Sequence, residues 1–230
     1  AQARVVDSTI TGNDAATGGG VGIGRQGGAV NSVQGAGAIQ LYNSTIAGNA
    51  ATAAGGGVYL ASFSTDGGTT NETPNATLYS SIVGDNLANG SPDDLATAPV
   101  TTPPSGRILA GYSLVEEPGT ARYSDSPTGS NLIDQDPRLL PLADNGGPTE
   151  TLLPANVSPA LDVGVSPLTL VGDHRGLARD IDLPKSPDPT TTHTDMGAVE
   201  LQGYTAPDTT IDSGPAATGP PRKKTSIKVS

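Results

Sequence analysis

The chain contains neither cysteine nor tryptophan, and only 3% of its 230 residues are aromatic. The absence of cysteine excludes a disulfide framework and thiolate metal sites. The shortage of aromatic side chains argues against a compact core built from bulky residues, and no apolar run approaches the length that spans a membrane. No secretory leader is visible, and the opening stretch ARVVDSTI resembles the middle of a repeat, so we expect a piece of a longer protein.

Positive charge is scarce as well. The chain has 12 basic and 23 acidic residues and a net charge of -11. Four basic residues lie within the last nine positions, namely Arg222, Lys223, Lys224 and Lys228. The acidic surface that remains repels phosphate backbones, so we expect no nucleic-acid partner.

Glycine and proline are abundant, with 31 and 20 residues respectively. The apolar residues are mostly Val, Ile, Leu and Ala, in short runs with Thr and Ser between them. Gly-Gly-Gly runs and short alternations such as TIT and TIA oppose the 3.6-residue period of a helix. The composition predicts many short strands separated by Gly, Asn and Pro turns.

Several phrases of the sequence recur. STITGN at 8–13 returns as STIAGN at 44–49, 36 residues later. LYNSTIAGN at 41–49 returns as LYSSIVGDN at 78–86, 37 residues later, and GYSLVE at 111–116 returns as GSNLID after 18. Repeats of unequal length that keep their apolar positions predict one structural unit with loops of variable size.

Each repeat is interpreted as three short strands that form one coil of a parallel β-solenoid. A single coil cannot bury its own apolar face, so coils stack at the spacing of strands in a sheet, about 4.8 Å. The side chains expected to point inward are Ile10, Val21, Ile23, Ile39 and Leu41 in the first copy, and Ile46, Val58, Leu60 and Leu78 in the second.

Stacked coils place like residues in columns. One apolar column is expected at Ile10, Ile46 and Val83, and one polar column at Asn13, Asn49 and Asn86. We expect these asparagines at a sharp turn, where Asn tolerates the left-handed region and stacked amides hydrogen-bond along the column. The Gly runs at 18–20 and 55–57 are expected at turns where a Cβ would clash.

Three polar, Gly-rich or Pro-rich stretches, 24–37, 61–75 and 89–106, are expected to stand out from the coils as loops. Residues 1–135 are therefore assigned to coils with loop insertions. Residues 136–203 are assigned to C-terminal coils and a closing segment. Residues 204–230 are expected to be a linker and the truncated start of a further domain, with a disordered tail as the alternative.

The stretch 136–200 carries the phrases DPRLLPLADNGGPTETLLPANVSPALDVG, GDHRGLAR and DMGAVE. Together they resemble the C-terminal signature of the choice-of-anchor Q family of bacterial surface or secreted proteins. NSTIAGN and GGGVYL resemble the repeats of the same family and of polymorphic outer-membrane proteins. The resemblance covers roughly residues 5–200 and implies an all-β, right-handed parallel β-helix with pectin-lyase-like architecture, located outside the bacterial cell or on its surface. It implies no reaction.

Two positions depart from the family pattern. Pro92-Asp93-Asp94-Leu95 stands where a typical member has Pro-Asp-Cys, and Asp173-His174-Arg175-Gly176 stands where the family often has Asp-Gln-Arg-Gly. Neither departure affects the fold that the resemblance implies, and the missing Cys removes any ground for a redox role.

One polar set is the leading candidate site: Asp162, Asp173, Arg175, Arg179, Asp195 and Glu200. Carboxylates near Arg could bind calcium and an acidic sugar, as in pectate lyases. In the alternative interpretation, which we favour, these ion pairs belong to a segment that covers an open β edge. Networks of structural ion pairs imitate catalytic ones.

Two further acidic stretches have both a functional and a structural interpretation. ADNGGPT at 143–149 has the composition of a calcium loop, but Asn145-Gly146 favours a tight turn. Asp93 and Asp94, with Asp85 nearby, could be the carboxylates of a glycoside hydrolase. A solvated acidic loop is the interpretation we favour for them.

The remaining candidates are histidines and tyrosines. His174 and His193 have no matching carboxylate spacing and predict no metal site. Tyr42, Tyr59 and Tyr79 fall on successive coil strands, and we interpret them as packing or edge residues rather than as a sugar-stacking platform.

The sequence thus favours a non-enzymatic, extracellular or cell-surface scaffold, monomeric, whose loops or β face bind other cells, matrix or polysaccharide. A polysaccharide lyase or glycoside hydrolase of the pectin-lyase-like fold is one alternative, and a mechanical spacer that carries a downstream domain is another. No cofactor is expected except, in the lyase alternative, calcium.

Overall fold

A computed structural model describes residues 2–24, 37–61, 63–64, 71–72, 74–98, 106–119, 121–183 and 193–203. Within these ranges the chain is all-β and contains no helix. The predicted linker at 204–230 and the centres of the first two predicted loops lie outside the described residues.

Sheets A and B contain five strands each. Sheet A has the order β1 (Gln2–Val6), β5 (Ala38–Tyr42), β11 (Asn75–Tyr79), β16 (Arg107–Gly111) and β18 (Tyr123–Asp125). Sheet B has the order β2 (Thr9–Ile10), β6 (Thr45–Ala47), β12 (Ile82–Gly84), β17 (Leu114–Val115) and β19 (Leu132–Ile133). All neighbours in both sheets are parallel.

The other sheets are smaller. Sheet C contains β3 (Asp14–Thr17), β7 (Ala50–Ala54), β13 (Leu87–Ala88) and β14 (Ser91–Pro92), and sheet D contains β4 (Val21–Ile23), β8 (Val58–Leu60) and β15 (Leu95–Thr97). Their neighbours are parallel except for the β13–β14 hairpin. An antiparallel pair, β9 (Phe63–Ser64) and β10 (Asn71–Glu72), forms within the predicted loop 61–75.

The register of the sheets confirms the repeats expected from the sequence. Ile10 pairs with Ile46, 36 residues later, and Ile46 pairs with Val83, 37 residues later. The short repeat is present as well, because Leu114 pairs with Leu132 at a separation of 18. Like side chains therefore lie above one another along the sheets.

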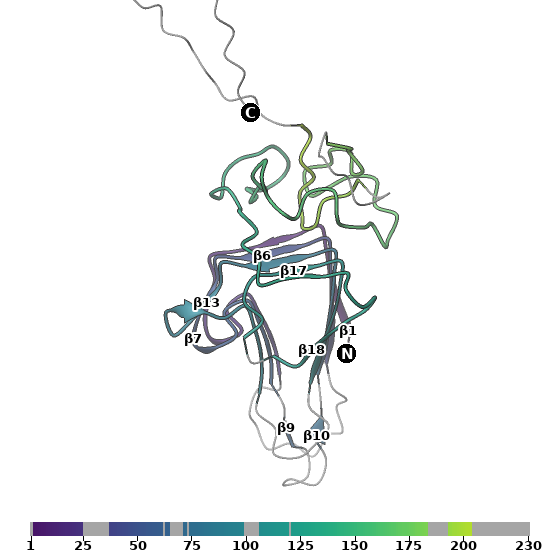
Figure 1. Ribbon diagram of the computed structural model, residues 1–230. Coiled ribbons are helices and arrows are strands. Elements are labelled where there is room, and N and C mark those ends of the chain that lie inside the picture. The colour runs from purple at the N-terminus through teal and green to yellow at the C-terminus, as the bar shows by residue number, and fades with distance from the viewer. Residues whose placement is uncertain are drawn as a thin grey trace, which may run out of the picture.

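The apolar side chains of sheets A, B and D meet in one core. All nine side chains predicted to point inward belong to this core: Val21, Leu41, Ile46, Val58, Leu60 and Leu78 are buried in it, and Ile10, Ile23 and Ile39 pack against it. Figure 1 shows sheet B, with β6 and β17, across one end of this body and sheet A, with β1 and β18, along its side.

The prediction of a loop at 89–106 is wrong in part. Its residues Leu95–Thr97 form β15, which pairs with β8 and is buried. Leu95 contributes to the core. The sequence did not predict this strand because the Pro and Asp residues on either side of it are typical of loops. The three residues between them are nevertheless buried and pair with β8.

Sheet B is covered on both faces. Val83 and Val115 point into the main core, whereas Ile82 and Leu114 pack with Met196 in a second cluster. Continuous short apolar strands are typical of sheets buried on both faces. Figure 1 accordingly shows the closing segment, coloured green to yellow, over the outer face of sheet B.

The closing segment thus lies against a sheet face. From the sequence we expect this segment to cover an open β edge and to include further coils. The described part of 136–203 contributes isolated bridges but no strand. Its apolar residues do not alternate with polar ones as they would in a strand. They pack individually on the sheet.

The turn before sheet C differs from the expected one by one residue. The left-handed residues are Gly12, Gly48 and Asp85, with φ of 69°, 68° and 56°, and each immediately precedes an asparagine of the predicted column. Glycine suits this conformation because it has no Cβ. The asparagines themselves are not left-handed, and their side chains are directed along the column.

Candidate functional site

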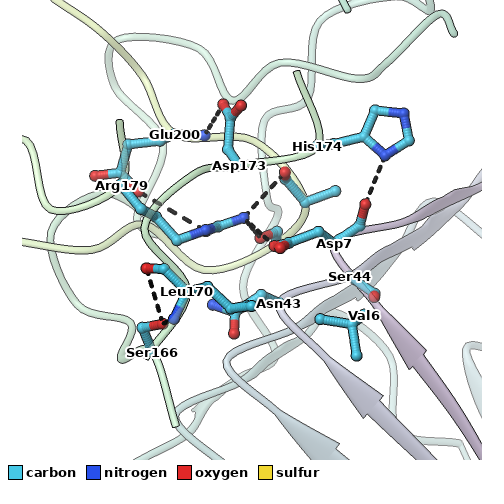
Figure 2. A network of polar contacts seen from close by, with 12 residues as sticks. Val6, Asp7, Asn43, Ser44, Ser166, Leu170, Asp173, His174, Arg179 and Glu200 are labelled. Atoms are coloured by element: carbon cyan, nitrogen blue, oxygen red, sulfur yellow. Dashed lines mark hydrogen bonds and ion pairs between the residues drawn. The ribbon is translucent and has the colours of Figure 1, made fainter. Parts of the chain in front are cut away.

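The six residues of the predicted polar set all belong to the closing segment. Asp195 and Glu200 are completely buried, Asp162 is 1% exposed, and Asp173 and Arg179 are buried as well. Figure 2 shows Arg179 and Glu200 from the closing segment beside Asp7, which belongs to the corner between sheets A and B. The set is therefore largely buried in the closing segment, and Arg179 connects it to the sheets.

Asp195 and Glu200 are linked through backbone amides. The Asp195 N–H donates to Glu200 Oε2 at 2.9 Å, and the Ile181 N–H donates to Oε1 at 3.1 Å. The carboxylate of Asp195 accepts from the N–H groups of Asp162 and Leu201 at 2.9 and 2.7 Å. All four carboxyl oxygens of this pair thus hold backbone in place.

Burial raises the pKa of both carboxyls, and each is close to the negative charge of other acids. The pKa of Asp195 rises to about 8, through burial and then through the charge of Glu200. The pKa of Glu200 rises to about 7, chiefly through burial, against the lowering effect of its backbone hydrogen bonds and of Arg179. Two adjacent buried carboxyls disfavour ionisation of each other.

Asp173 forms an ion pair with Arg175. Its Oδ2 lies 2.7 Å from Arg175 Nη2 and accepts the Glu200 N–H at 3.0 Å. Burial alone would raise the pKa of Asp173, but the hydrogen bonds from Arg175 and from the Glu200 backbone lower it below its ordinary value. Arg175 also donates to the Glu200 carbonyl, so the pair joins two turns of the closing segment.

Arg179 reaches from the closing segment to the sheets. Its Nη2 lies 2.6 Å from Asp7 Oδ1 and donates to the Ala198 carbonyl at 3.0 Å. Its Nη1 lies 3.8 Å from Glu200 Oε2. His174 contacts the same corner, with Nδ1 2.5 Å from the Asp7 carbonyl oxygen. Ion pairs and hydrogen bonds therefore tie the segment to the β1–β2 corner (Figure 2).

This geometry gives the polar set a structural task. Its carboxylates are engaged by backbone N–H groups and arginines in a buried place, where they cannot contact a polymer. In the described ranges no group of three or more His, Asp or Glu residues could hold a metal ion. His193 pairs with Asp180 at 3.5 Å, away from His174.

The asparagine column is a chain of hydrogen bonds. Asn49 Oδ1 accepts from Asn13 Nδ2 at 2.9 Å and from its N–H at 3.1 Å. Asn86 Oδ1 accepts from Asn49 in the same way, at 2.9 and 3.0 Å. A second column, made of serines, lies at the opposite end of the sheet B strands, where the Ser44 N–H donates to Ser81 Oγ at 3.2 Å.

Asp94 ends the asparagine column. Its Oδ1 accepts from Asn86 Nδ2 at 2.8 Å, and its Oδ2 accepts the Glu117 N–H at 2.7 Å. The residue is 1% exposed, so the interpretation as a solvated acidic loop is wrong for Asp94. Burial raises its pKa to about 6, against the lowering effect of the hydrogen bonds from Asn86 and Glu117.

The other two carboxylates of that candidate do not converge with Asp94. Asp93 Oδ2 accepts the Gly55 N–H at 2.9 Å, and Asp85 is exposed at the preceding turn. ADNGGPT forms a tight turn, in which the Gly146 N–H donates to Asp144 Oδ1 at 3.0 Å and Ala143 bridges to Thr151. These carboxylates stabilise turns and do not form a reaction centre.

The outer face of sheet A carries a row of tyrosines that the sequence only partly indicated. The rings of Tyr42 and Tyr79 lie 6.1 Å apart, and those of Tyr79 and Tyr112 lie 5.4 Å apart. Tyr59 belongs to β8 in sheet D and is not part of the row. We call Tyr42, Tyr79 and Tyr112 the tyrosine row.

Tyr112 was missed because it is out of register with the other two. The residue that pairs with Tyr79 is Gly111, whose missing side chain leaves room for the Tyr79 ring, 3.1 Å from where a Cβ would lie. Tyr112 then turns in a left-handed conformation, with φ of 50°. Its place as the second residue of a recurring phrase, GYSLVE, was the available signal.

Two arginines lie on the same face, Arg4 beside Tyr42 and Arg107 at the opposite end of its strand from Tyr112. Arg4 lies over the Tyr42 ring, with Cζ 5.6 Å from the ring centroid, and donates from Nε to Gln40 Oε1 at 3.1 Å. Arg107 donates from Nε to Ser124 Oγ at 2.9 Å. A hollow of about 290 Å³ is lined by Gly106, Arg107, Arg122, Tyr123 and Ser124.

Comparisons of this chain with protein-family models, curated proteins and solved structures return no match. The resemblance to the choice-of-anchor Q family therefore rests on the motifs quoted above. The part of the chain that the structure describes contains no helix with the length and hydrophobicity that crossing a membrane requires.

Proposed function

We propose that the chain is part of a right-handed parallel β-helix that acts as a non-enzymatic scaffold at the surface of a bacterium or outside it, and that binds polysaccharide on the outer face of sheet A. The parallel sheets, the separations of 36 and 37 residues between paired strands and the recurring turns support the β-helix. The choice-of-anchor Q resemblance supports the location.

The tyrosine row is the observation that carries the binding function, and the proposal departs here from the sequence-based interpretation of Tyr42 and Tyr79 as packing or edge residues. Its half-buried rings follow one another across β5, β11 and the end of β16. Aromatic rings offer an apolar face to a ligand and a hydroxyl that hydrogen-bonds. A polymer lying across the strands would meet a ring about every 4.8 Å of sheet, which suits a linear glycan.

A non-enzymatic role is favoured because the carboxylates that sequence reasoning considered for catalysis have other tasks. Asp94 ends the asparagine column, and Asp195 and Glu200 hold backbone amides inside the closing segment. General acid or base catalysis requires a group within hydrogen-bond reach of the substrate, and these buried groups are not.

The test is retention of the purified chain on immobilised polysaccharides, with release of new chain ends measured in parallel. We expect retention without release, and we expect Tyr79→Ala to weaken it while Tyr59→Ala, on sheet D, leaves it unchanged. Thermal unfolding of both variants verifies that they fold. Release of chain ends would favour the lyase or hydrolase, and no retention on any polysaccharide would favour the spacer.

A further inference from the structure

The charges on the outer face of sheet A differ from those of the chain as a whole. The described residues contain six arginines, and Arg4, Arg107 and Arg122 lie on or beside this face. The outward positions of the strands add polar or apolar residues: Gln2, Val6, Ala38, Gln40, Tyr42, Asn75, Thr77, Tyr79, Leu109, Gly111 and Ser124. None of these is acidic, although the chain has 23 acidic residues.

The nearest acidic side chain in β18 is directed to other partners. Asp125 Oδ1 accepts from Asn131 Nδ2 at 2.9 Å, and its Oδ2 accepts the Gly129 N–H at 3.3 Å. Asp125 pairs with Ala110, a core residue, whereas Ser124 beside it pairs with exposed Leu109. The alternation of the strand thus keeps the carboxylate off the outer face.

Two arginines line the hollow together. Arg107 and Arg122 precede the paired residues Ile108 and Tyr123, so they lie on neighbouring strands at the same level. Among the described residues the side-chain hydrogen bonds of Arg4 and Arg107 use Nε, which leaves the Nη nitrogens for a ligand.

The net charge of -11 does not cancel this local positive charge. At physiological ionic strength the Debye length is about 8 Å. Carboxylates farther away than this are largely screened, whereas neighbouring guanidinium groups act on a ligand directly. The charges of Asp125 and Asp134 still reach Tyr123, which lines the hollow. Guanidinium forms paired hydrogen bonds with carboxylate and with other oxyanions.

We infer that the outer face of sheet A selects glycans that carry anionic groups, binding their sugar rings at the tyrosine row and their carboxylate or sulfate oxygens at Arg107 and Arg122. The inference rests on the proposed polysaccharide-binding function and specifies its ligand class. Arg4, fixed over Tyr42, supplies a second positive site at the opposite edge of the sheet. Arg4 in β1 and Arg122 beside β18 are separated by four strand spacings, roughly 19 Å, so the ligand is a polymer rather than a single sugar.

The experiment compares the affinity of the chain for polygalacturonate, dextran sulfate and neutral dextran of similar length, by calorimetry at physiological salt. Polyglutamate serves as an anionic polymer without sugar rings. The variant is the double substitution Arg107→Gln with Arg122→Gln, and the control is Arg138→Gln, an exposed arginine on the closing segment. Thermal unfolding is measured for each protein.

We expect one or both anionic glycans to bind at least about tenfold more tightly than dextran, and the double variant to lose about tenfold, since each exposed ion pair contributes up to about 1 kcal/mol. Arg138→Gln should leave both affinities unchanged. The two anionic polymers separate carboxylate from sulfate recognition.

Three outcomes would overturn the inference. Dextran bound as tightly as the charged glycans would refute the selection and leave the proposed polysaccharide-binding function standing. Binding of no glycan of either class would refute both. Polyglutamate bound as tightly as polygalacturonate would show attraction to polyanions in general, without recognition of sugar.

Discussion

Asp94 accepts two hydrogen bonds from Asn86, from Nδ2 at 2.8 Å and from the backbone N–H at 3.2 Å. Asn86 accepts the same two hydrogen bonds from Asn49 through its amide oxygen. At the end of the column the acceptor is thus a carboxylate in place of an amide. A carboxylate can accept with both oxygens, and the second one holds the Glu117 N–H. One residue thereby joins the column to the next turn of chain.

Replacing Asp94 by alanine should destabilise the fold by about 2–4 kcal/mol, because the donors of Asn86 and Glu117 would be buried without an acceptor. Asp94→Asn should cost less, since its amide oxygen can still accept from Asn86. Chemical denaturation followed by circular dichroism measures the change. Asp14→Ala, at an exposed position of β3, should stay within about 0.5 kcal/mol, and an equal loss in both alanine variants would contradict the role of Asp94.

The apolar interior was predictable from the sequence, whereas the end of the asparagine column was not. Ile10, Ile46 and Val83 recur at nearly constant spacing, because stacked strands require like residues at like positions. Asp94 follows Asn86 by eight residues, across the β13–β14 hairpin, so no repeat marks it. Only the fold-back of that hairpin brings the two together.

The closing segment was recognised as a unit, but its place was not. The buried side chains that attach it to sheet B, such as Met196 and Ala160, are not spaced with the two-residue period of a strand. The sequence of the segment therefore does not show that it packs on a sheet face. The outward apolar residues of sheet B, Ile82 and Leu114, were the available sign, because an exposed sheet face would carry polar residues there.

Gly57 lies where the chain approaches Asp94 and the core. A Cβ added there would lie 2.6 Å from the Asp94 carbonyl oxygen and 2.8 Å from Val83 Cγ1. Gly57→Ala should therefore destabilise the protein by about 1–3 kcal/mol, measured as a lower denaturation midpoint. Gly22→Ala is the matched control, since its Cβ would meet nothing closer than the Thr17 carbonyl oxygen at 3.5 Å. A midpoint lowered equally by Gly22→Ala would contradict the steric explanation.

Met196 anchors the closing segment on sheet B. It is 1% exposed and packs with Ile82 and Leu114. Met196→Ala should cost about 2–5 kcal/mol through the cavity that it leaves, and limited proteolysis should cut the closing segment before the sheets. Val171→Ala, at a side chain that is 88% exposed on the same segment, should leave the cleavage rate unchanged. Uniform cleavage of the whole chain in Met196→Ala would show that the segment and the sheets unfold as one unit.

The Asp195–Glu200 pair should make stability fall as the pH rises. The ordinary pKa values of these groups are 3.8 and 4.5, and in the folded protein they are about 8 and 7. Between the two sets of values the folded state binds more protons than the unfolded state, so the free energy of unfolding decreases with pH. The stabilisation is complete below pH 4 and is lost as the pH passes through about 8, with an expected total loss on the order of a few kcal/mol.

Other carboxyls change stability in different pH ranges. Asp94, with a pKa of about 6, contributes a decrease mainly between pH 4 and 6. The lowered pKa of Asp173 contributes stability above its ordinary value of 3.8, which is lost only as the pH falls further. Thermal unfolding between pH 6.5 and 8.5 therefore reports chiefly on Asp195 and Glu200.

Glu200→Gln is the decisive variant for this pH effect. Both oxygens of Glu200 accept backbone N–H groups, so the amide should lower the melting temperature at every pH. It should also flatten the decrease between pH 6.5 and 8.5, because one titrating group is gone and Asp195 no longer faces its charge. Glu150→Gln, at an exposed position, should keep the slope of the parent. Stability that stays level or rises across this range in the parent would show that the two carboxyls are already ionised when the closing segment is in place.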